Sequence, residues 1–343
     1  MPKYLFPFLF SFLLSVVFMA LAVYFSNKFN WQERREKRHI HKKGISRVGG
    51  LIMVLVFNLM IILNRDLFIS SEIYGMMAAS LILLAVGLWD DIKEIYWKIQ
   101  LFFQVAISVL VFITGIRIYY VTNPFTGGMF EFNSSLLILL SIGIVVFWIV
   151  LIINAINWLD GVDGLSGGVT LISIATIFFL SLKNEVNQPP IAIICAILSG
   201  VILGFLIFNF YPAKIMAGTS GSMFMGFILA VLAIIAGTKI ATAILVMTIP
   251  IVDFLWVIGE RIRSGQSIFN PDSCHLHYKL LKMGWTEKKI ALCYWSVTAA
   301  TAAVALNTKA IGKGITLLVS VLIMLLTLIY ISKKTSKNNN HEA

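Results

Sequence analysis

The chain has 343 residues, 59% hydrophobic and only 13% charged, whereas a soluble domain has roughly 45–50% apolar and about 25% charged residues. Too little charge remains to solvate a globular surface of this size, and the chain is too apolar to be disordered, so both classes are excluded. In a soluble protein the net charge of +11 would suggest nucleic acid, but in a membrane protein cations first report orientation. We therefore predict an integral membrane protein with no nucleic-acid partner.

A spanning helix needs roughly 20 apolar residues, because the hydrocarbon core of a bilayer is about 30 Å thick. Eleven candidate segments occur, several of them shorter than this. In chain order they are approximately Tyr4–Tyr24, Val48–Leu63, Ile73–Trp89, Lys98–Ile116, Ser135–Ile153, Gly168–Leu182, Pro190–Asn209, Met223–Ala236, Ile240–Ile258, Ile290–Leu306 and Ile315–Ile331. The predicted fold is all-α, a polytopic membrane domain over residues 1–332, with a polar, disordered tail at 333–343.

The distribution of cations predicts the orientation. Eight Lys and Arg residues lie between Asn27 and Arg47, and the positive-inside rule places this loop in the cytoplasm. The N-terminus is then outside and the C-terminus cytoplasmic, with 20 of the 27 cations on the cytoplasmic side. The alternative is a signal peptide ending near Ala20-Leu21-Ala22, but its cleavage would leave the basic run outside.

Acidic residues near the membrane are costly and usually functional. Five of the sixteen lie in or against apolar segments, all at predicted cytoplasmic ends: Asp90, Asp91, Asp160, Asp163 and Asp253. Adjacent residues do not share a helix face, so at most one of Asp90 and Asp91 points into a site. The other could orient it or cap the next helix, and a solvated helix end is the alternative for both.

The run from Asn154 to Gly168 contains two amides, two carboxylates and four glycines between two predicted spans. Glycines let the backbone approach a ligand closely, and a following helix N-terminus offers N–H groups to an anion. Carboxylates can hold Mg²⁺, which often also binds phosphates. The run predicts a site for Mg²⁺ and phosphate rather than a tight interhelical turn. The polar connection from Asn209 to Ser222 also suits phosphate, although alone it is unspecific.

Cysteine and histidine content raises the question of metal binding. Cys195, Cys274 and Cys293 make no disulfide framework, and the first and last lie in apolar runs as small core residues. Cys274 with His275 and His277 invites a zinc interpretation, but the spacing matches no usual finger. Histidines that contact an anionic substrate fit better with the carboxylates.

From Lys43 to about Leu281 the chain resembles the polyprenyl-phosphate N-acetylhexosamine-1-phosphate transferases, also called glycosyltransferase family 4 and related to phospho-N-acetylmuramoyl-pentapeptide transferase. Asn154 through Leu165 matches the specific signature Asn-x-x-Asn-x-x-Asp-Gly-x-Asp-Gly-Leu. The other matching segments are the Gly-Gly motif at 43–50, Asp90-Asp91 with Lys98, Pro250–Asp253 and Pro271–Leu281.

The resemblance implies a Mg²⁺-dependent enzyme of the cytoplasmic membrane, active on its cytoplasmic face. It would transfer a sugar 1-phosphate from a UDP-N-acetylamino sugar to polyprenyl phosphate and release UMP, the first membrane step of cell-envelope polysaccharide synthesis. The absence of a three-histidine run favours UDP-N-acetylglucosamine over the pentapeptide branch. A homodimer is among the assemblies that the resemblance allows.

The resemblance also implies residue roles. The catalytic residues would be Asp90, Asp91 and Asp163; the substrate-binding residues Lys43, Arg47, Asn154, Asn157, Asp160, Asn209, Met216, His275 and His277; and the metal ligands Asp91, Asp163 and the position of Thr219.

Two departures from the family pattern bear on activity. The family usually has Phe-Met-Gly-Asp where this chain has Met216-Ala217-Gly218-Thr219, and His-x-His-His where it has His275-Leu276-His277-Tyr278. Loss of one positioned electrostatic group can cost about 10²–10³ in rate, so Thr219 matters most. A catalytically impaired relative that binds lipid phosphate or acts as a scaffold is therefore one alternative. An ion-coupled transporter is another, but its carboxylates should lie near the midplane.

Overall fold

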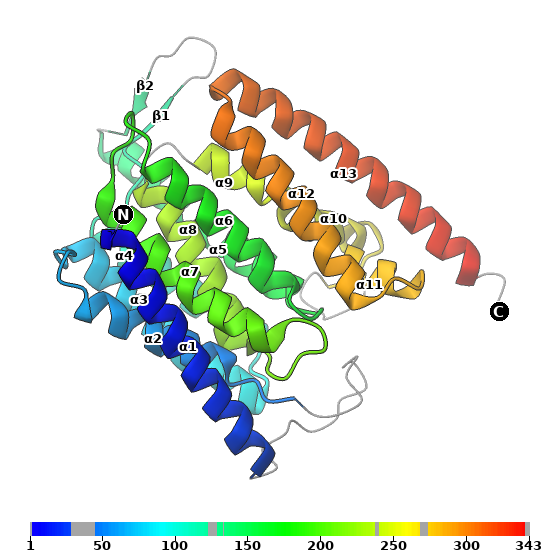
Figure 1. Cartoon of the computed structure of the whole chain (residues 1–343). Coiled ribbons are helices and arrows are strands. Elements are labelled where there is room, and N and C mark those ends of the chain that lie inside the picture. The colour runs from blue at the N-terminus through cyan, green and yellow to red at the C-terminus, as the bar shows by residue number, and fades with distance from the viewer. Residues whose placement is uncertain are drawn as a thin grey trace.

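The computed structural model describes residues 2–28, 45–122, 129–132, 134–236, 240–267 and 274–339. It is a helix bundle with one short antiparallel hairpin at one end (Figure 1). Its elements are α1 (Pro2–Lys28), α2 (Gly49–Leu63), α3 (Ser71–Lys93), α4 (Trp97–Ile113), β1 (Tyr120–Thr122), β2 (Met129–Glu131), α5 (Ser135–Leu159), α6 (Leu165–Ser181), α7 (Pro189–Asn209), α8 (Gly218–Ile235), α9 (Ile240–Val246), α10 (Thr248–Arg263), α11 (Leu276–Lys282), α12 (Glu287–Asn307) and α13 (Ala310–Asn339). The predicted all-α class is confirmed.

The protein is a multi-pass membrane protein. Within the described ranges, seven helices are long and apolar enough to cross a bilayer, or eight if the bent pair α9 and α10 is one span. Three shorter apolar helices, α2, α4 and α6, coincide with the remaining predicted segments. The count of eleven spans and their orientation stay predictions.

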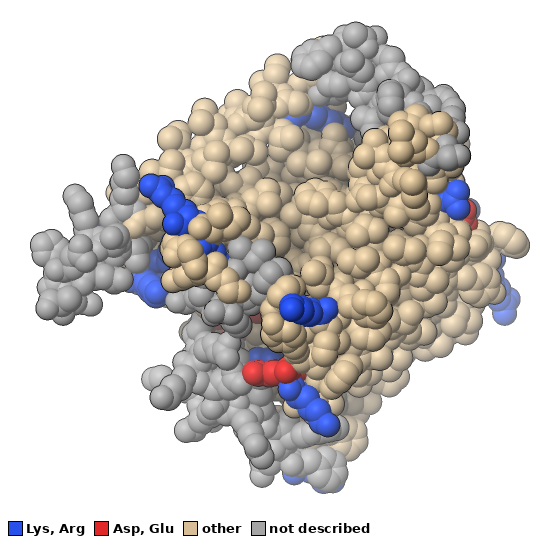
Figure 2. Space-filling model, turned by 180° about the vertical axis from the view of Figure 1, so that it is seen from behind, with Lys and Arg blue, Asp and Glu red and all other residues tan. Residues whose placement is uncertain are grey.

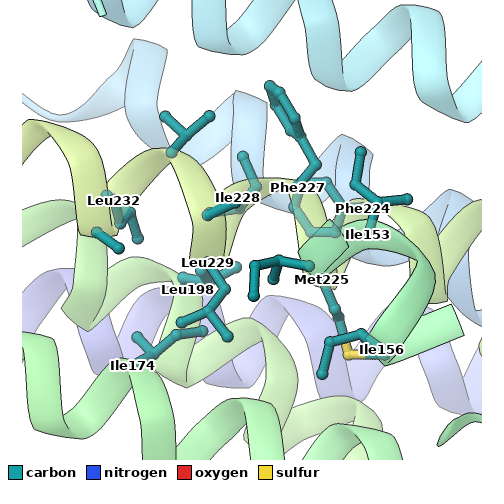
Figure 3. Close-up of a cluster of buried hydrophobic side chains, with 14 of the residues drawn as sticks. Ile153, Ile156, Ile174, Leu198, Phe224, Met225, Phe227, Ile228, Leu229 and Leu232 are labelled. Atoms are coloured by element: carbon teal, nitrogen blue, oxygen red, sulfur yellow. The ribbon is translucent and has the colours of Figure 1, made fainter. Parts of the chain in front are cut away.

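Burial separates central from peripheral helices. In α8, 89% of the residues in an 18-residue apolar stretch are buried, against 17% in the corresponding stretches of α1 and α13. Because α8 packs against α2, α3, α5 and α6, it forms the centre of the bundle. Its side chains Phe224, Phe227 and Ile228 are fully buried among apolar residues of neighbouring helices (Figure 3). From the opposite side, the described surface is mostly uncharged, as expected for a lipid-facing wall (Figure 2).

Glycines permit α2 and α3 to approach the first turn of α8. A β-carbon at Gly50 would lie 2.2 Å from the backbone nitrogen of Gly221, and one at Gly87 would lie 2.3 Å from the Cα of Ser220. Without side chains at Gly50 and Gly87, the three backbones meet where the polar residues gather. Small residues allow such close helix contacts in membranes.

The predicted span Ile240–Ile258 corresponds to two helices, α9 and α10, rather than to one. The chain bends by 75° between α9 and α10, at Met247. Pro250 lies in the first turn of α10, where its missing N–H has no intrahelical partner to lose. A proline at this position is compatible with a new helix start and disfavours a continuous helix through it.

Two further predictions need correction. The predicted disordered tail is helical over residues 333–339, because α13 continues to Asn339; residues 340–343 lie outside the described ranges. Lysine is a good helix former, so a helix started in the apolar segment can continue into this polar stretch. Cys195 is buried, as expected for a small core residue, but Cys293 is exposed on α12.

Candidate active site

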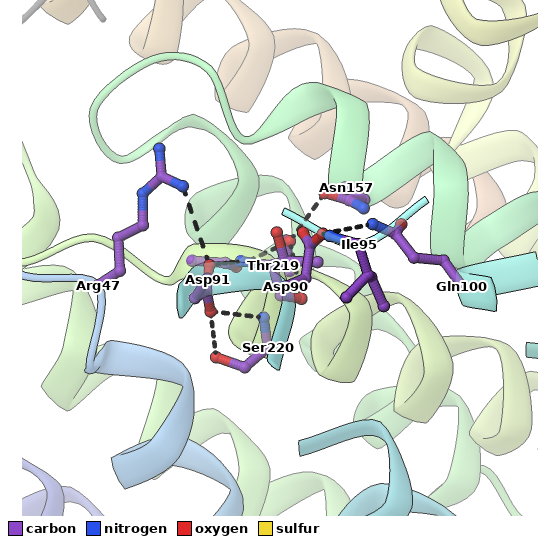
Figure 4. A network of polar contacts seen from close by, with 10 residues as sticks. Arg47, Asp90, Asp91, Ile95, Gln100, Asn157, Thr219 and Ser220 are labelled. Atoms are coloured by element: carbon purple, nitrogen blue, oxygen red, sulfur yellow. Dashed lines mark hydrogen bonds and ion pairs between the residues drawn. The ribbon is translucent and has the colours of Figure 1, made fainter. Parts of the chain in front are cut away.

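The polar ends of α3, α5, α7 and α10 lie at the end of the bundle opposite the β1–β2 hairpin (Figure 1). Asp91, in the last turn of α3, reaches the first turn of α8. Its Oδ1 accepts the N–H of Thr219 at 2.8 Å, and its Oδ2 accepts the N–H and hydroxyl of Ser220 at 3.2 and 3.0 Å (Figure 4). First-turn N–H groups lack intrahelical partners and favour negative charge. The Asp91 carboxylate is therefore held in one orientation.

Asp90 points away from Asp91, toward α4. Its Oδ1 accepts the N–H of Ile95 at 3.0 Å and the side-chain amide of Gln100 at 2.8 Å (Figure 4). Asn154 also faces α4, because its amide donates to Gln104 Oε1 at 2.7 Å. These contacts hold α4 against α3 and α5. They also direct the Asp90 carboxylate away from that of Asp91, which contacts α8.

The segment before α2 runs beside the connection from α7 to α8. Met216 donates its N–H to the carbonyl oxygen of Ser46 at 2.9 Å, and Gly49 donates to the carbonyl of Met216 at 3.1 Å. This pairing brings Arg47 to the site, where its Nη1 lies 4.0 Å from Asp91 Oδ1. Arg47 thereby places positive charge beside a buried carboxylate.

The signature run covers the end of α5 and the turn between α5 and α6. Asn157 accepts the hydroxyl of Ser222 at 3.1 Å, which joins α5 to α8. Asp160 accepts a hydrogen bond from the hydroxyl of Ser166. Asp163 is buried, and its Oδ2 accepts the N–H of Ala213 at 2.8 Å. The run thus contacts both α8 and the connection that precedes it.

Asn209, the last residue of α7, links this turn to the same connection. Its Oδ1 accepts the N–H of Gly164 at 3.0 Å, while its amide donates to the carbonyl of Ile215 at 2.9 Å and lies 3.7 Å from the sulfur of Met216. Through these hydrogen bonds, Asn209 holds the turn after α5 against the connection between α7 and α8.

His275 is oriented by a carboxylate of α10. Asp253 Oδ2 lies 3.0 Å from His275 Nδ1, and Oδ1 accepts the N–H of Leu276 at the start of α11. A carboxylate at Nδ1 fixes the ring orientation and favours a proton on that nitrogen. Asp253 therefore positions both the first histidine and the short helix that follows it.

His277 lies directly on the turn between α5 and α6. A β-carbon at Gly161 would be 2.8 Å from His277 Nε2 and 2.5 Å from the Tyr278 hydroxyl. His277 is fully buried and neither ring nitrogen has a hydrogen-bond partner within the described structure. Burial lowers the pKa of His277 to about 3, so the ring is neutral at physiological pH.

Carboxylates outnumber cations among the described residues of the site. Burial raises the pKa of Asp160 to about 7, against the opposing Ser166 hydrogen bond and the Arg47 charge, and the charges of Asp91 and Asp163 raise it further. These mutual effects show that the three carboxylates share one region. Within the described residues, Arg47 is the cation that acts on Asp160, and one guanidinium does not balance three aspartates, so this part of the site suits an additional cation.

The structure thus brings together Arg47, Asp91, Asn157, Asp160, Asp163, Asn209, Thr219 and His277, while Asp90 and Asn154 face α4. Lys43 lies outside the described residues. Sequence reasoning missed two residues. Ser220 donates its hydroxyl to the Asp91 carboxylate, and Glu287 Oε2 accepts the N–H of Asp163 at 3.2 Å. An acidic residue directly after Thr286, a helix N-cap, is a common helix start and carried no functional signal.

The donor set fits Mg²⁺. No three His, Cys, Asp or Glu side chains of the described residues form a preformed metal cage. Mg²⁺ does not require one, since it usually keeps several waters and binds through one or two carboxylates plus substrate phosphates. Oxygen donors in a site with excess negative charge meet that requirement.

Comparison with known proteins identifies the family. The model of glycosyl transferase family 4 matches residues 73–237. A Mycobacterium leprae protein named decaprenyl-phosphate N-acetylglucosaminephosphotransferase is 31% identical over 287 residues, covering 75% of this chain and 71% of its own length. The chain belongs to glycosyl transferase family 4. It is therefore a membrane transferase.

Two further relatives are named for two different transferase activities. A Bacillus subtilis protein named probable undecaprenyl-phosphate N-acetylglucosaminyl 1-phosphate transferase is 27% identical over 271 residues, covering 77% of this chain and 74% of the relative. A Clostridium beijerinckii phospho-N-acetylmuramoyl-pentapeptide-transferase is 30% identical over 317 residues, covering 87% and 94%. Both relatives match more than three quarters of this family 4 chain.

We predict that Gly218→Ala disrupts this end of the bundle. Gly218 has a φ of +69°, and a β-carbon there would lie 2.6 Å from Asp91 Oδ2 and 2.9 Å from the carbonyl oxygen of Arg47. Strain and steric overlap should destabilise the variant by roughly 1–3 kcal/mol and lower its melting temperature in detergent. Gly143→Ala is the control, since no atom lies within 4 Å of its β-carbon position. Equal melting temperatures for the two variants would contradict the prediction.

Proposed function

We propose that the protein transfers N-acetylglucosamine 1-phosphate from UDP-N-acetylglucosamine to a polyprenyl phosphate, giving polyprenyl-diphospho-N-acetylglucosamine and UMP. The observation that carries the proposal is the shared buried region of Asp91, Asp160 and Asp163, beside Arg47 and the α8 N-terminus. The names of the mycobacterial and B. subtilis relatives supply the substrate class. The bias of cations supports a cytoplasmic site.

The chemistry is a phosphoryl transfer. An oxygen of the lipid phosphate attacks the β-phosphorus of the nucleotide sugar, and the bond from that phosphorus to the bridging oxygen breaks, so UMP leaves with the electron pair. Such reactions depend mainly on positioning and on stabilisation of charge. Mg²⁺, held by Asp91 and Asp163 with the hydroxyl of Thr219 as a neutral third donor, would neutralise charge on the phosphates.

Side chains of this protein would position the two substrates. Arg47 supplies a cation next to Asp91 for a phosphate. His277 is neutral and has both ring nitrogens without partners in the described structure, so it can bind the diphosphate-sugar as a hydrogen-bond donor. Of the two adjacent aspartates, Asp91 is the one that would position the lipid phosphate. Asp90 instead accepts hydrogen bonds from Ile95 and Gln100.

An assay in membranes tests the proposal. Membranes that contain the overexpressed protein receive polyprenyl phosphate, Mg²⁺ and a panel of labelled UDP-N-acetylamino sugars, with Asp163→Asn as the inactive control. We expect label from UDP-N-acetylglucosamine in the lipid extract, far above the control. Absence of a lipid-linked product from every sugar would contradict the proposal.

Thr219 gives a second candidate, a catalytically impaired relative that binds lipid phosphate. Thr219 donates its N–H to Asp91 and brings no charge to the α8 N-terminus. If the unmodified protein is inactive and Thr219→Asp forms product, the impaired relative is supported. Product formation by the unmodified protein excludes it.

A further inference from the structure

The turn that carries Asp163 is held by α12, a helix outside the signature. The Glu287 carboxylate, in the first turn of α12, accepts the N–H of Asp163 at 3.2 Å. Two turns further along, the indole N–H of Trp295 donates to the carbonyl oxygen of Gly164 at 3.2 Å. One helix therefore contacts successive backbone groups of the turn.

Helix α12 fits closely against this turn. Gly164 has a φ of +72°, and this left-handed conformation directs its carbonyl toward Trp295. A β-carbon at Gly168 would lie 1.9 Å from the Trp295 ring, so the indole occupies the space that a side chain would fill. Phe210 also packs against the indole, with ring centroids 5.3 Å apart. The fit leaves the turn little freedom to move relative to α12.

Glu287 is buried, with only 8% of its surface exposed, and a buried carboxylate needs hydrogen-bond partners. Its contact with the Asp163 N–H gives it a specific role. With its N–H held by Glu287, Asp163 directs its carboxylate to Ala213.

Helix α12 also follows closely after the histidine segment. Residues 283–286 connect α11, which contains His277, to Glu287. The segment that contacts Gly161 and the residue that holds Asp163 are therefore parts of one short stretch.

We propose that Glu287 is a positioning residue for the transferase: it fixes the backbone of Asp163, with Trp295 fixing the adjacent peptide, so that the aspartate turn and the histidine segment keep one relative placement. This role in the reaction rests on the proposed function. Glu287 acts through Asp163 and touches no substrate.

Enzyme kinetics test the effect on the reaction. Glu287→Ala should lower kcat about 10- to 100-fold with little change in KM for the nucleotide sugar, as loss of outer-shell partners commonly does. Glu287→Gln keeps a carbonyl oxygen that can accept the Asp163 N–H, and it should stay within about threefold of the unmodified enzyme. Glu185→Ala, an exposed acid after α6, is the control. A Glu287→Ala enzyme with unchanged kcat, or a Gln variant as slow as the Ala variant, would overturn the proposal.

Hydrogen–deuterium exchange of the full-length protein tests the contact without activity. In Glu287→Ala, amides of residues 160–168 should exchange faster than in the unmodified protein, while those of α7 stay unchanged. Glu287→Gln and Glu185→Ala should match the unmodified protein. Unchanged exchange over 160–168 in Glu287→Ala would overturn the positioning role of Glu287 even if no sugar is transferred. Faster exchange over 160–168 in Glu287→Ala, together with an unmodified protein that transfers no sugar, would support the positioning of Asp163 and refute the proposed function instead.

Discussion

Asp91→Asn should lower kcat by about 10²–10³-fold, the usual cost of removing one positioned electrostatic group. Both oxygens of Asp91 accept from the start of α8, so an amide in the same place would turn its NH₂ toward the N–H of Thr219 or Ser220. Donor facing donor cannot form a hydrogen bond, and the negative charge beside Arg47 disappears. Transfer of label to polyprenyl phosphate by the purified variant measures the effect.

Asp66→Asn is the matched control for Asp91→Asn. Asp66 is exposed between α2 and α3, toward the hairpin end of the bundle, so its replacement should leave kcat within about twofold. If Asp91→Asn retains activity comparable to this control, the carboxylate at the α8 N-terminus has no catalytic importance.

The second large effect concerns Asp160, whose replacement should stabilise the protein while abolishing most of its activity. Because burial raises the pKa of Asp160 from 3.8 to about 7, the folded protein binds a proton that the unfolded chain has released between these values. The contribution of Asp160 to the free energy of unfolding is therefore fully present below about pH 4, and it is lost as the pH rises through 7. The loss approaches about 4 kcal/mol, from roughly three pKa units at about 1.4 kcal/mol each.

Asp160→Asn stays neutral at every pH and keeps an oxygen for the Ser166 hydroxyl. In EDTA, its melting temperature in detergent should exceed that of the unmodified protein at pH 8, and the difference should shrink toward pH 5. Its transferase rate at saturating Mg²⁺ should nevertheless fall by about 10²-fold, because a charge at the phosphates is lost. A melting-temperature difference that does not vary with pH would contradict the assigned pKa.

Hydrophobic segment lengths and the charged motifs allowed much of this arrangement to be predicted. Each of the eleven apolar segments coincides with a helix, or with α9 and α10 together, because backbone groups in a bilayer must be satisfied within the helix. The signature residues Asp160 and Asp163 and the distant Asp91 do share one region. These features follow from local composition, which sequence patterns report well.

Long-range geometry was not predictable. The pair Asp90-Asp91 left open which carboxylate enters the site, since the answer depends on where α4 and α8 pack against α3. The bend at Met247 has only Pro250 as a local signal. Glu287 had no motif, because its importance comes from α12 packing against α6 rather than from its neighbours in sequence.

The central claim, a phosphoryl transfer to lipid, is tested most directly by following the β-phosphorus. The purified protein is given polyprenyl phosphate, Mg²⁺ and UDP-N-acetylglucosamine labelled with ³²P at the β-position and with ³H in the sugar. The account predicts that both labels enter the lipid in equal amounts, with one unlabelled UMP released for each. Entry of ³H without ³²P, with release of labelled UDP, would show a sugar transfer that leaves the diphosphate intact and would contradict the account.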